Sequence, residues 1–262
     1  MSKFSANLGF LWTELDLLSA LYKAKKVGFK GIEFHWPYDV PSKNLKKMLN
    51  ELDLTPICLN TLPGDQRKNE NGLSAIDSKI KKARQAIDIA IKYAYEINCD
   101  MIHVMAGNAK KNKISDYIFL ENLKYACDKA EKVNKVILIE VLNPVDAPGY
   151  YLDDFKKALD IVDSVGANNL KIMFDCYHLQ KQGLNIRALF VNYLDYIGHI
   201  QIASVPYRDE PIYNNDCYKK ILQYFKDNGW VGFIGAEYKP KTTTDDGIGW
   251  VKLYGSDLNN VF

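Results

Sequence analysis

The chain has 262 residues, of which 47% are hydrophobic and 25% are charged, a composition typical of a globular protein with one large core. Its 34 basic and 32 acidic residues give a formal net charge of +2, and the lysines are dispersed, which argues against nucleic acid as the main partner. The sequence contains no run of about 18 apolar residues, and Glu14 and Asp16 interrupt the apolar start, so we expect a cytoplasmic protein without a signal peptide or membrane span.

Short apolar runs alternate with longer amphipathic segments along the chain, which is the pattern of repeated βα units around a parallel sheet. Strands are predicted at about 4–9, 31–34, 55–60, 101–105, 136–140, 170–175, 197–201 and 232–237. Helices are predicted at about 15–27, 42–52, 77–98, 115–133, 153–165, 185–193 and 216–228. In the first helix, Leu17, Leu18 and Leu21 fall at helical spacing, and Gly28 is the expected stop.

The number of units predicts the fold. Eight βα units in about 250 residues are typical of a closed (β/α)₈ TIM barrel, which would make residues 1–262 a single domain with its site at the carboxyl ends of the strands. The alternative is an open doubly wound α/β sheet. We prefer the barrel because no glycine-rich dinucleotide-binding motif follows the first strand.

A polar stretch that includes residues 63–72 follows the third strand. Loops longer than about 12 residues in a compact domain are usually functional or disordered. We interpret residues 63–72 as a partial lid over the site. The alternative is an ordinary solvated loop.

Four later strands end on an oxygen ligand, namely Glu140, Asp175, Gln201 and Glu237. They are separated by 35, 26 and 36 residues, which is about one βα unit each time, so parallel strands bring all four to one rim. Two glutamates, an aspartate and a neutral amide suit Mg²⁺ or Mn²⁺, and the scarcity of Cys and His among them disfavours zinc. Taken singly, each acid is also explained as a helix cap or a salt-bridge partner.

Further side chains are candidates for substrate binding at the same rim. His103 lies in the fourth strand, where a hydrogen-bonded core histidine is the alternative, and His178 follows Asp175 by three residues. Arg208 and Lys239 are candidates to hold an anionic substrate, with surface salt bridges as the alternative. Other candidates are His35 for the rim, Phe10, Trp12, Trp36 and Tyr38 for the pocket wall, and His199 for a structural role.

The five cysteines are scattered and include no CxxC pair, which argues against a zinc or redox site. We expect reduced thiols. The residues concerned are Cys58, Cys99, Cys127, Cys176 and Cys217.

Several motifs occur together in this chain: Ala6-Asn7, Glu33-Phe34 with Pro37-Tyr38, Asn60-Thr61-x-Pro63-Gly64-Asp65 with Gly72-Leu73-Ser74-Ala75, His103-Val104-Met105-Ala106-Gly107, Ile139-Glu140, Asp175-x-x-His178, His199-x-Gln201-Ile202-Ala203 and Glu237-Tyr238-Lys239-Pro240. Together they resemble the hydroxypyruvate isomerase family of the xylose-isomerase-like barrel superfamily. The resemblance covers nearly the whole chain. It departs from the family pattern at Arg208-Asp209-Glu210-Pro211, where Arg-His-Glu-Pro is common, and at Glu140-Val141-Leu142, where Glu-Ala-Leu is common.

The resemblance implies a divalent metal, Mg²⁺ or Mn²⁺, held by Glu140, Asp175, Gln201 and Glu237, with Glu140 and Glu237 as the acid/base pair. Related ketose 3-epimerases generally have histidine where Gln201 stands, so Gln201 favours the hydroxypyruvate isomerase branch. The implied reaction interconverts hydroxypyruvate and tartronate semialdehyde by proton transfer through an enediolate.

Alternatives remain at this stage. They are a 2-oxo-tetronate isomerase, a ketose 3-epimerase or a lyase of the same superfamily, and a non-catalytic sugar-binding barrel. In each case the expected partner is a short 2-oxo acid or sugar, with no nucleic acid or membrane, and a homo-oligomer is compatible with the sequence.

Overall fold

The computed structural model describes residues 3–211 and 215–255 of the chain. Eight parallel strands form a closed barrel in the order β1 to β8, which confirms the TIM barrel and excludes the open sheet. The strands are β1 Lys3–Asn7, β2 Gly31–Phe34, β3 Thr55–Asn60, β4 Met101–His103, β5 Val136–Glu140, β6 Leu170–Asp175, β7 Ile197–Ile202 and β8 Phe233–Ala236.

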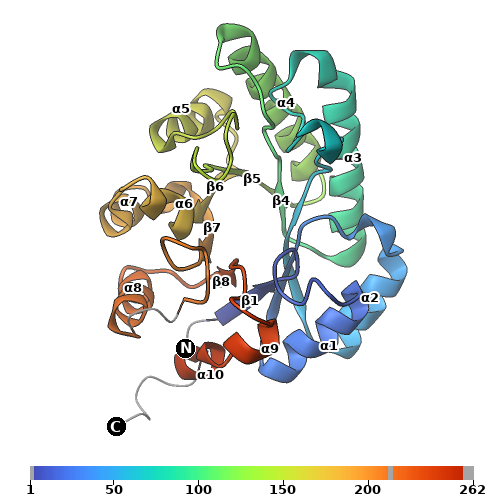
Figure 1. The fold of residues 1–262 in the computed structure, drawn as a ribbon. Helices are drawn as coiled ribbons and strands as arrows, with labels where there is room; N and C mark the ends of the chain where they lie inside the picture. Colours follow the sequence, from blue (N-terminus) through green and yellow to red (C-terminus); the bar gives the residue numbers. More distant parts are fainter. Residues whose placement is uncertain (1–2, 212–214, 256–262) are drawn as a thin grey trace. The chain divides into compact units, whose positions relative to one another are not determined.

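Helices alternate with the strands along the chain (Figure 1). They are α1 Leu17–Val27, α2 Ser42–Glu51, α3 Ile80–Ile97, α4 Lys113–Glu131, α5 Phe155–Val165, α6 Cys176–Lys181, α7 Ile186–Asn192, α8 Asn215–Asp227, α9 Thr244–Gly247 and α10 Trp250–Gly255. Single 3₁₀ turns lie at η1 Pro37–Asp39, η2 Gln66–Lys68, η3 Asp77–Lys79 and η4 Leu194–Tyr196. The predicted helices are all present with small shifts at their ends, whereas α6, α9 and α10 were not predicted.

The chain divides into two compact units. The first unit comprises residues 1–57, 175–194 and 199–262, and the second unit comprises residues 58–174 and 195–198. Strands β3 and β6 each run from one unit into the other, because the divisions fall between residues 57 and 58 and between residues 174 and 175.

In the first unit, the strand registers place polar residues at the carboxyl ends of neighbouring strands. Asn7 of β1 lies opposite Glu33 of β2, and Gln201 of β7 lies opposite Gly235 of β8. Helix α1 begins after the cap Asp16, whose carboxylate accepts from the Ser19 amide.

In the second unit, β5 is apolar except for the acid at its end. Ile137, Leu138 and Ile139 are completely buried, and Glu140 lies opposite Met173 of β6, two residues before the end of that strand. Helices α3 and α4 pack side by side in this unit (Figure 1). The buried run explains why a charged residue at its end is held in a defined place.

The loop that contains residues 63–72 is tied down at both ends. The Gly72 amide donates to the Pro63 carbonyl at 2.8 Å, and Gly72 adopts a φ of 102° that a side chain would strain. A Cβ at Gly72 would also lie 2.5 Å from the Met105 carbonyl oxygen. Arg67, by contrast, has a side chain that is 92% exposed. Any lid motion is therefore confined to the tip around η2, and the lid itself remains a prediction.

Candidate active site

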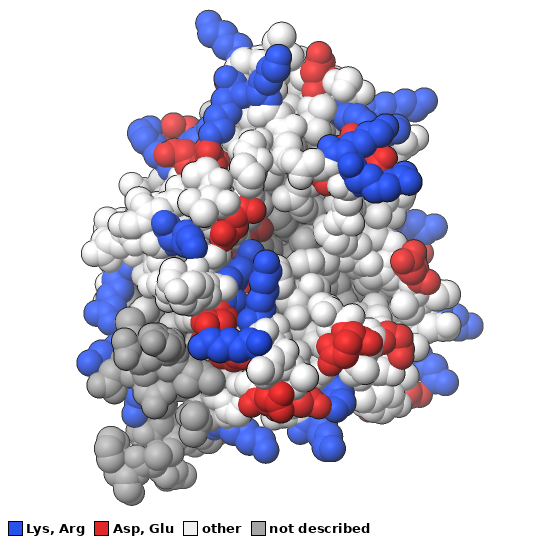
Figure 2. Space-filling model, viewed as in Figure 1, with Lys and Arg blue, Asp and Glu red and all other residues white. Residues whose placement is uncertain are grey.

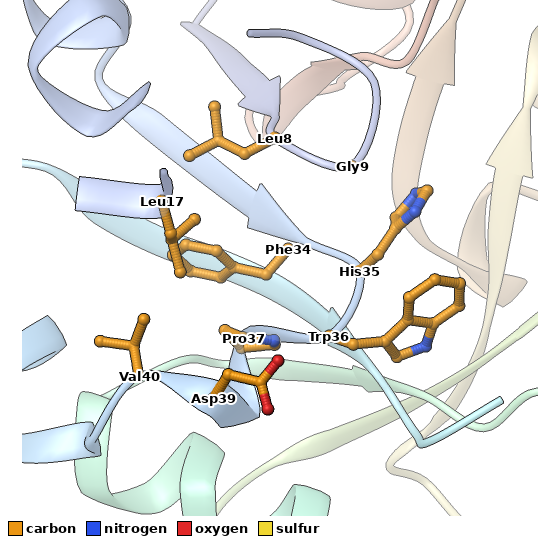
Figure 3. A pocket seen from close by; sticks show the side chains of 9 residues that line it. All are labelled: Leu8, Gly9, Leu17, Phe34, His35, Trp36, Pro37, Asp39 and Val40. Carbon is orange, nitrogen blue, oxygen red and sulfur yellow. The ribbon is translucent and has the colours of Figure 1, made fainter. Parts of the chain in front are cut away.

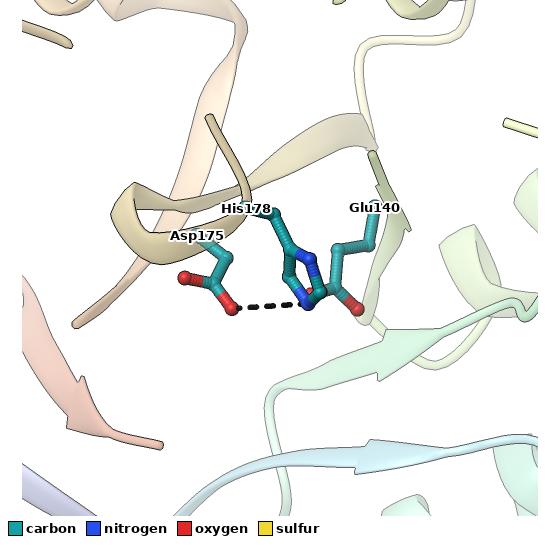
Figure 4. Close-up of side chains that lie close together, drawn as sticks. All are labelled: Glu140, Asp175 and His178. Carbon is teal, nitrogen blue, oxygen red and sulfur yellow. Dashed lines mark ion pairs between the residues drawn. The ribbon is translucent and has the colours of Figure 1, made fainter. Parts of the chain in front are cut away.

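The four predicted metal ligands are all buried. Glu140, Asp175 and Gln201 end or nearly end β5, β6 and β7, and Glu237 directly follows β8. Their exposed fractions are 6%, 2%, 1% and 7% respectively, which is unusual for three acids and an amide unless they share partners. Glu140, Asp175 and His178 form a buried group that could hold a metal ion (Figure 4). His178, expected at the substrate, is therefore also a candidate ligand.

Asp175 has two roles because α6 begins directly after β6. Its Oδ1 atom caps the helix by accepting from the Tyr177 amide at 2.8 Å. Its Oδ2 atom lies 3.6 Å from Nε2 of His178, the ion pair that is dashed in Figure 4. The helix-cap explanation for this acid is thus correct, and it leaves the second oxygen directed at a candidate ligand.

Arg208 places a positive charge among the acids of the first unit. Its Nη2 atom lies 2.6 Å from Oε1 of Glu237 and 3.3 Å from Oδ2 of Asp175. The guanidinium also lies over the rings of Phe10 and Tyr177, at 4.6 and 5.2 Å from their centroids. Arg208 therefore offsets part of the negative charge of these two carboxylates.

The backbone of Arg208 is fixed in an uncommon conformation. Its φ is +60°, in the left-handed region that non-glycine residues seldom adopt. Two hydrogen bonds hold it there: the Arg208 amide donates to the Ser204 carbonyl at 2.8 Å, and the Lys239 amide donates to the Arg208 carbonyl at 2.7 Å. The guanidinium therefore extends from a loop whose backbone is already fixed by hydrogen bonds.

Glu237 is the acid whose protonation is most altered by its surroundings. Burial raises the pKa of Glu237 to about 8, and the Asp175 and Glu33 carboxylates act in the same direction. Arg208 opposes this rise, as does Asn7, whose Nδ2 donates to Glu237 Oε2 at 2.8 Å. A carboxyl group with this pKa can hold or release a proton near neutral pH, which general acid–base catalysis requires.

Glu33 is a residue that the sequence analysis did not assign to the site. It is 1% exposed, and it accepts from Ser5 Oγ at 2.5 Å and from Gln201 Nε2 at 2.7 Å. His199 Nε2 lies 2.9 Å from Glu33 Oε1, which agrees with the structural role expected of His199. Burial alone would raise the pKa of Glu33, but His199 and the hydrogen bonds hold it below its usual value. The sequence signals were an acid within the apolar strand β2 and its place in the Glu33-Phe34 motif.

In the second unit, Glu140 lies near another buried histidine. Nδ1 of His103 is 3.6 Å from Oε2 of Glu140. The hydroxyl of Tyr150 accepts from the Ala106 amide at 3.0 Å, and burial together with the charge of Glu140 raises the pKa of Tyr150. His103 and Glu140 thus form a pair, so His103 is more than an isolated core histidine.

Two other predicted site residues lie elsewhere. The side chain of Lys239 is exposed, and it makes no ion pair among residues 3–211 and 215–255. Trp12 is buried, and its indole Nε1 donates to Asp245 at 2.7 Å, which makes it a packing residue that joins the loop after β1 to α9. Lys239 contributes to the site through its main-chain amide, which donates a hydrogen bond to the Arg208 carbonyl.

A pocket of about 390 Å³ lies in the first unit beside the ends of β1 and β2 (Figure 3). Its lining residues are Leu8, Gly9, Leu17, Phe34, His35, Trp36, Pro37, Asp39 and Val40, none of which is a predicted metal ligand. Burial, reinforced by Arg208, lowers the pKa of His35 to about 4, so its imidazole is neutral at neutral pH. Phe10 contacts both the His35 ring and the Arg208 guanidinium, so this ring connects the pocket to the acids.

The surface and the cysteines agree with the composition. Figure 2 shows basic and acidic side chains interspersed over the visible face, without a stripe of one sign. Within the described part of the chain, no helix has both the length and the apolar character needed to cross a membrane. Cys58, Cys99, Cys127 and Cys176 are buried free thiols, whereas the side chain of Cys217 lies outside the described residues.

Comparisons with known proteins agree with this geometry. Residues 21–254 match the family described as xylose isomerase-like TIM barrel. The chain is 36% identical over 260 residues to hydroxypyruvate isomerase of Escherichia coli (strain K12), covering 97% of this chain and 100% of the relative. It is 34% identical over 257 residues to 2-oxo-tetronate isomerase of Haemophilus influenzae (strain ATCC 51907 / DSM 11121 / KW20 / Rd), covering 97% and 100%.

A solved structure is also similar. It is the crystal structure of AP endonuclease, family 2 from Brucella melitensis, with a TM-score of 0.93 and 32% sequence identity. The match covers 97% of this chain and 99% of that one. These relatives confirm the prediction that the chain is an enzyme of the isomerase type, which acts on a small molecule.

Proposed function

This chain belongs to the xylose isomerase-like TIM barrel family, and we propose that it is a metal-dependent isomerase that interconverts hydroxypyruvate and tartronate semialdehyde (2-hydroxy-3-oxopropanoate). The observation that carries the proposal is that Asp175, Gln201 and Glu237 are all buried at or next to strand ends, with Arg208 paired to both acids. Relatives named hydroxypyruvate isomerase and 2-oxo-tetronate isomerase support a short 2-oxo acid as substrate.

The donor set fits a hard divalent cation. Oε1 of Gln201 is buried and has no hydrogen-bond partner among the described residues, which would cost free energy unless a cation or other partner meets it. Asp175 and His178 belong to a group that could hold a metal ion, and Glu237 and Glu140 are the further proposed oxygen ligands. Oxygen-rich sets of this kind suit Mg²⁺ or Mn²⁺.

The reaction requires one proton to leave C3 of hydroxypyruvate and one to be added at C2, while the hydroxyl proton moves between the two oxygens. The metal, when bound, stabilises the negative charge that develops on these oxygens. Glu237 is the proposed base, because its carboxylate is buried at the proposed metal site and an ionised carboxylate can accept a proton. Glu140 is the proposed second acid/base group.

Other side chains are proposed to bind the substrate. Arg208 would hold the substrate carboxylate, because its planar guanidinium matches that group and its loop is already fixed. His178 lies beside Asp175, and His103 beside Glu140, so both are proposed to contact the substrate oxygens. Lys239, with an exposed side chain, is the weakest of the four proposed binding residues.

An assay of the purified protein tests the proposal. Protein treated with a chelator and then reloaded with Mg²⁺ or Mn²⁺ is supplied with hydroxypyruvate, a 2-oxo-tetronate and a ketose. We expect turnover of hydroxypyruvate that needs the added metal. Faster turnover of the 2-oxo-tetronate or the ketose would identify a 2-oxo-tetronate isomerase or a 3-epimerase instead, and binding without turnover would indicate a sugar-binding barrel.

A further inference from the structure

A glutamine ligand presents a problem of orientation. Its amide carries an oxygen at one end and an NH₂ group at the other, and rotation about the last side-chain bond exchanges them. Only the oxygen can bind a cation. Gln201 is 1% exposed, so water cannot compensate for an amide that faces the wrong way. The site therefore needs a neighbour that sets the direction of this amide.

Glu33 has the position and the chemistry for this task. Nε2 of Gln201 donates to Oε2 of Glu33 at 2.7 Å, and an ionised carboxylate can only accept hydrogen bonds. The nitrogen must therefore face Glu33, and Oε1 must face away from it. Among the described residues, that oxygen has no hydrogen-bond partner.

We propose that Glu33 is a positioning residue that turns the amide oxygen of Gln201 toward the divalent cation. The inference rests on the proposed function, because it requires Gln201 to be a metal ligand. Glu33 itself would not touch the metal or the substrate. It acts through Gln201, as the partners of metal ligands commonly do.

The Glu33 carboxylate is itself held in one place. Ser5 Oγ at 2.5 Å and His199 Nε2 at 2.9 Å both approach Oε1, which leaves Oε2 for Gln201. Strand β8, which pairs with the strand of Gln201, makes room for it with Gly235, where a Cβ would lie 2.3 Å from Glu33 Oε1. Each oxygen of the Glu33 carboxylate thus has its own partners. The contacts at Oε1 keep Oε2 in position to accept the hydrogen bond from Gln201.

The first test measures the binding of Mn²⁺ to chelator-treated protein by calorimetry, without any turnover. Glu33→Gln should weaken Mn²⁺ binding by about 10–100-fold, because an amide at position 33 no longer dictates which end of Gln201 faces the cation. Ser5→Ala is the matched control, since it removes a hydrogen bond to the same carboxylate and leaves the bond to Gln201. It should lose much less affinity than Glu33→Gln, because His199 still approaches Oε1 and the carboxylate still accepts from Gln201.

A double variant gives the sharper result. Combining Glu33→Gln with Gln201→Glu moves the carboxylate across the same hydrogen bond and keeps the net charge. A carboxylate offers oxygen at both ends, so it needs no orientation, and Mn²⁺ affinity should return at least to the wild-type level. A double variant as weak as Glu33→Gln, or a Glu33→Gln protein that binds like the wild type, would overturn the inference while leaving the metal site standing.

A measurement on the wild-type protein avoids the risk that a variant fails to fold. In NMR spectra, the Gln201 side-chain N–H protons should exchange slowly with and without Mg²⁺, and the amide carbon should shift when Mg²⁺ is added. A fast-exchanging amide, or an unmoved carbon in protein saturated with Mg²⁺, contradicts the inference. Wild-type protein that binds neither Mn²⁺ nor Mg²⁺ would refute the proposed function together with the inference.

Discussion

Proton competition at Glu237 gives a quantitative prediction. A metal ion binds the ionised carboxylate, so a proton on Glu237 must leave before the metal can bind. With a pKa of about 8, most Glu237 side chains carry a proton at pH 7 in the metal-free protein. We therefore expect metal affinity to rise with pH through the neutral range, whereas an acid that is already ionised would give no pH dependence there.

The magnitude follows from the pKa. Below pH 8 the ionised fraction falls almost tenfold for each pH unit, so Mn²⁺ affinity should fall about tenfold, or about 1.4 kcal/mol, between pH 7 and pH 6. Calorimetry under argon, repeated in buffers with different ionisation enthalpies, also measures how many protons are released when the metal binds. At pH 6.5, close to one proton should leave Glu237 per metal ion bound.

Glu237→Gln is the control for this experiment. It removes the titrating group and keeps the shape, so it should bind Mn²⁺ more weakly and lose the part of the pH dependence that belongs to Glu237. Equal pH dependence in both proteins would show that Glu237 is already ionised in the metal-free state, and the assignment of its proton would be wrong.

Two further predictions concern Asp175 and the loop. Asp175→Asn should keep the cap of α6 and most of the stability while losing metal affinity, whereas Asp175→Ala should lose affinity and also about 1 kcal/mol of unfolding free energy, measured by urea denaturation. Wild-type metal affinity and activity in either variant would refute the site. In residues 63–72, hydrogen exchange at the tip Gln66–Lys68 should slow when a substrate analogue binds, because closure excludes water; unchanged exchange would make this an ordinary loop.

The barrel could be predicted because its strands are short apolar runs. The predicted bounds of β2, β3, β5 and β6 agree with the structure residue for residue. The ends of β1 and β4 were placed too far along the chain, since main-chain hydrogen bonds between neighbouring strands continue past them: the Leu8 amide still donates to the Glu33 carbonyl, and the Val104 amide to the Leu138 carbonyl. Apolar residues also continue past both strand ends, so apolar character does not mark where a strand stops.

The parts of the site that depend on contacts distant in sequence could not be predicted. Glu33 and Gln201 are 168 residues apart, and nothing local to either one indicates their hydrogen bond. Helix α6 was missed because it has only six residues and follows directly after its cap Asp175, whose position suggested a ligand. The regular spacing of the predicted strand ends identified the acids. The residues that contact these acids could be identified only from the structure.

The route of the hydrogen atom tests the central claim most directly. Metal-loaded protein is supplied with hydroxypyruvate in D₂O, and the deuterium at C2 of the tartronate semialdehyde is measured by mass spectrometry and NMR. Proton transfer through Glu237 exchanges with solvent, so we expect deuterium at this carbon, and Glu237→Gln should lose nearly all turnover. Product that carries the original hydrogen and no solvent deuterium, together with a Glu237→Gln variant of near-normal kcat, would contradict the account.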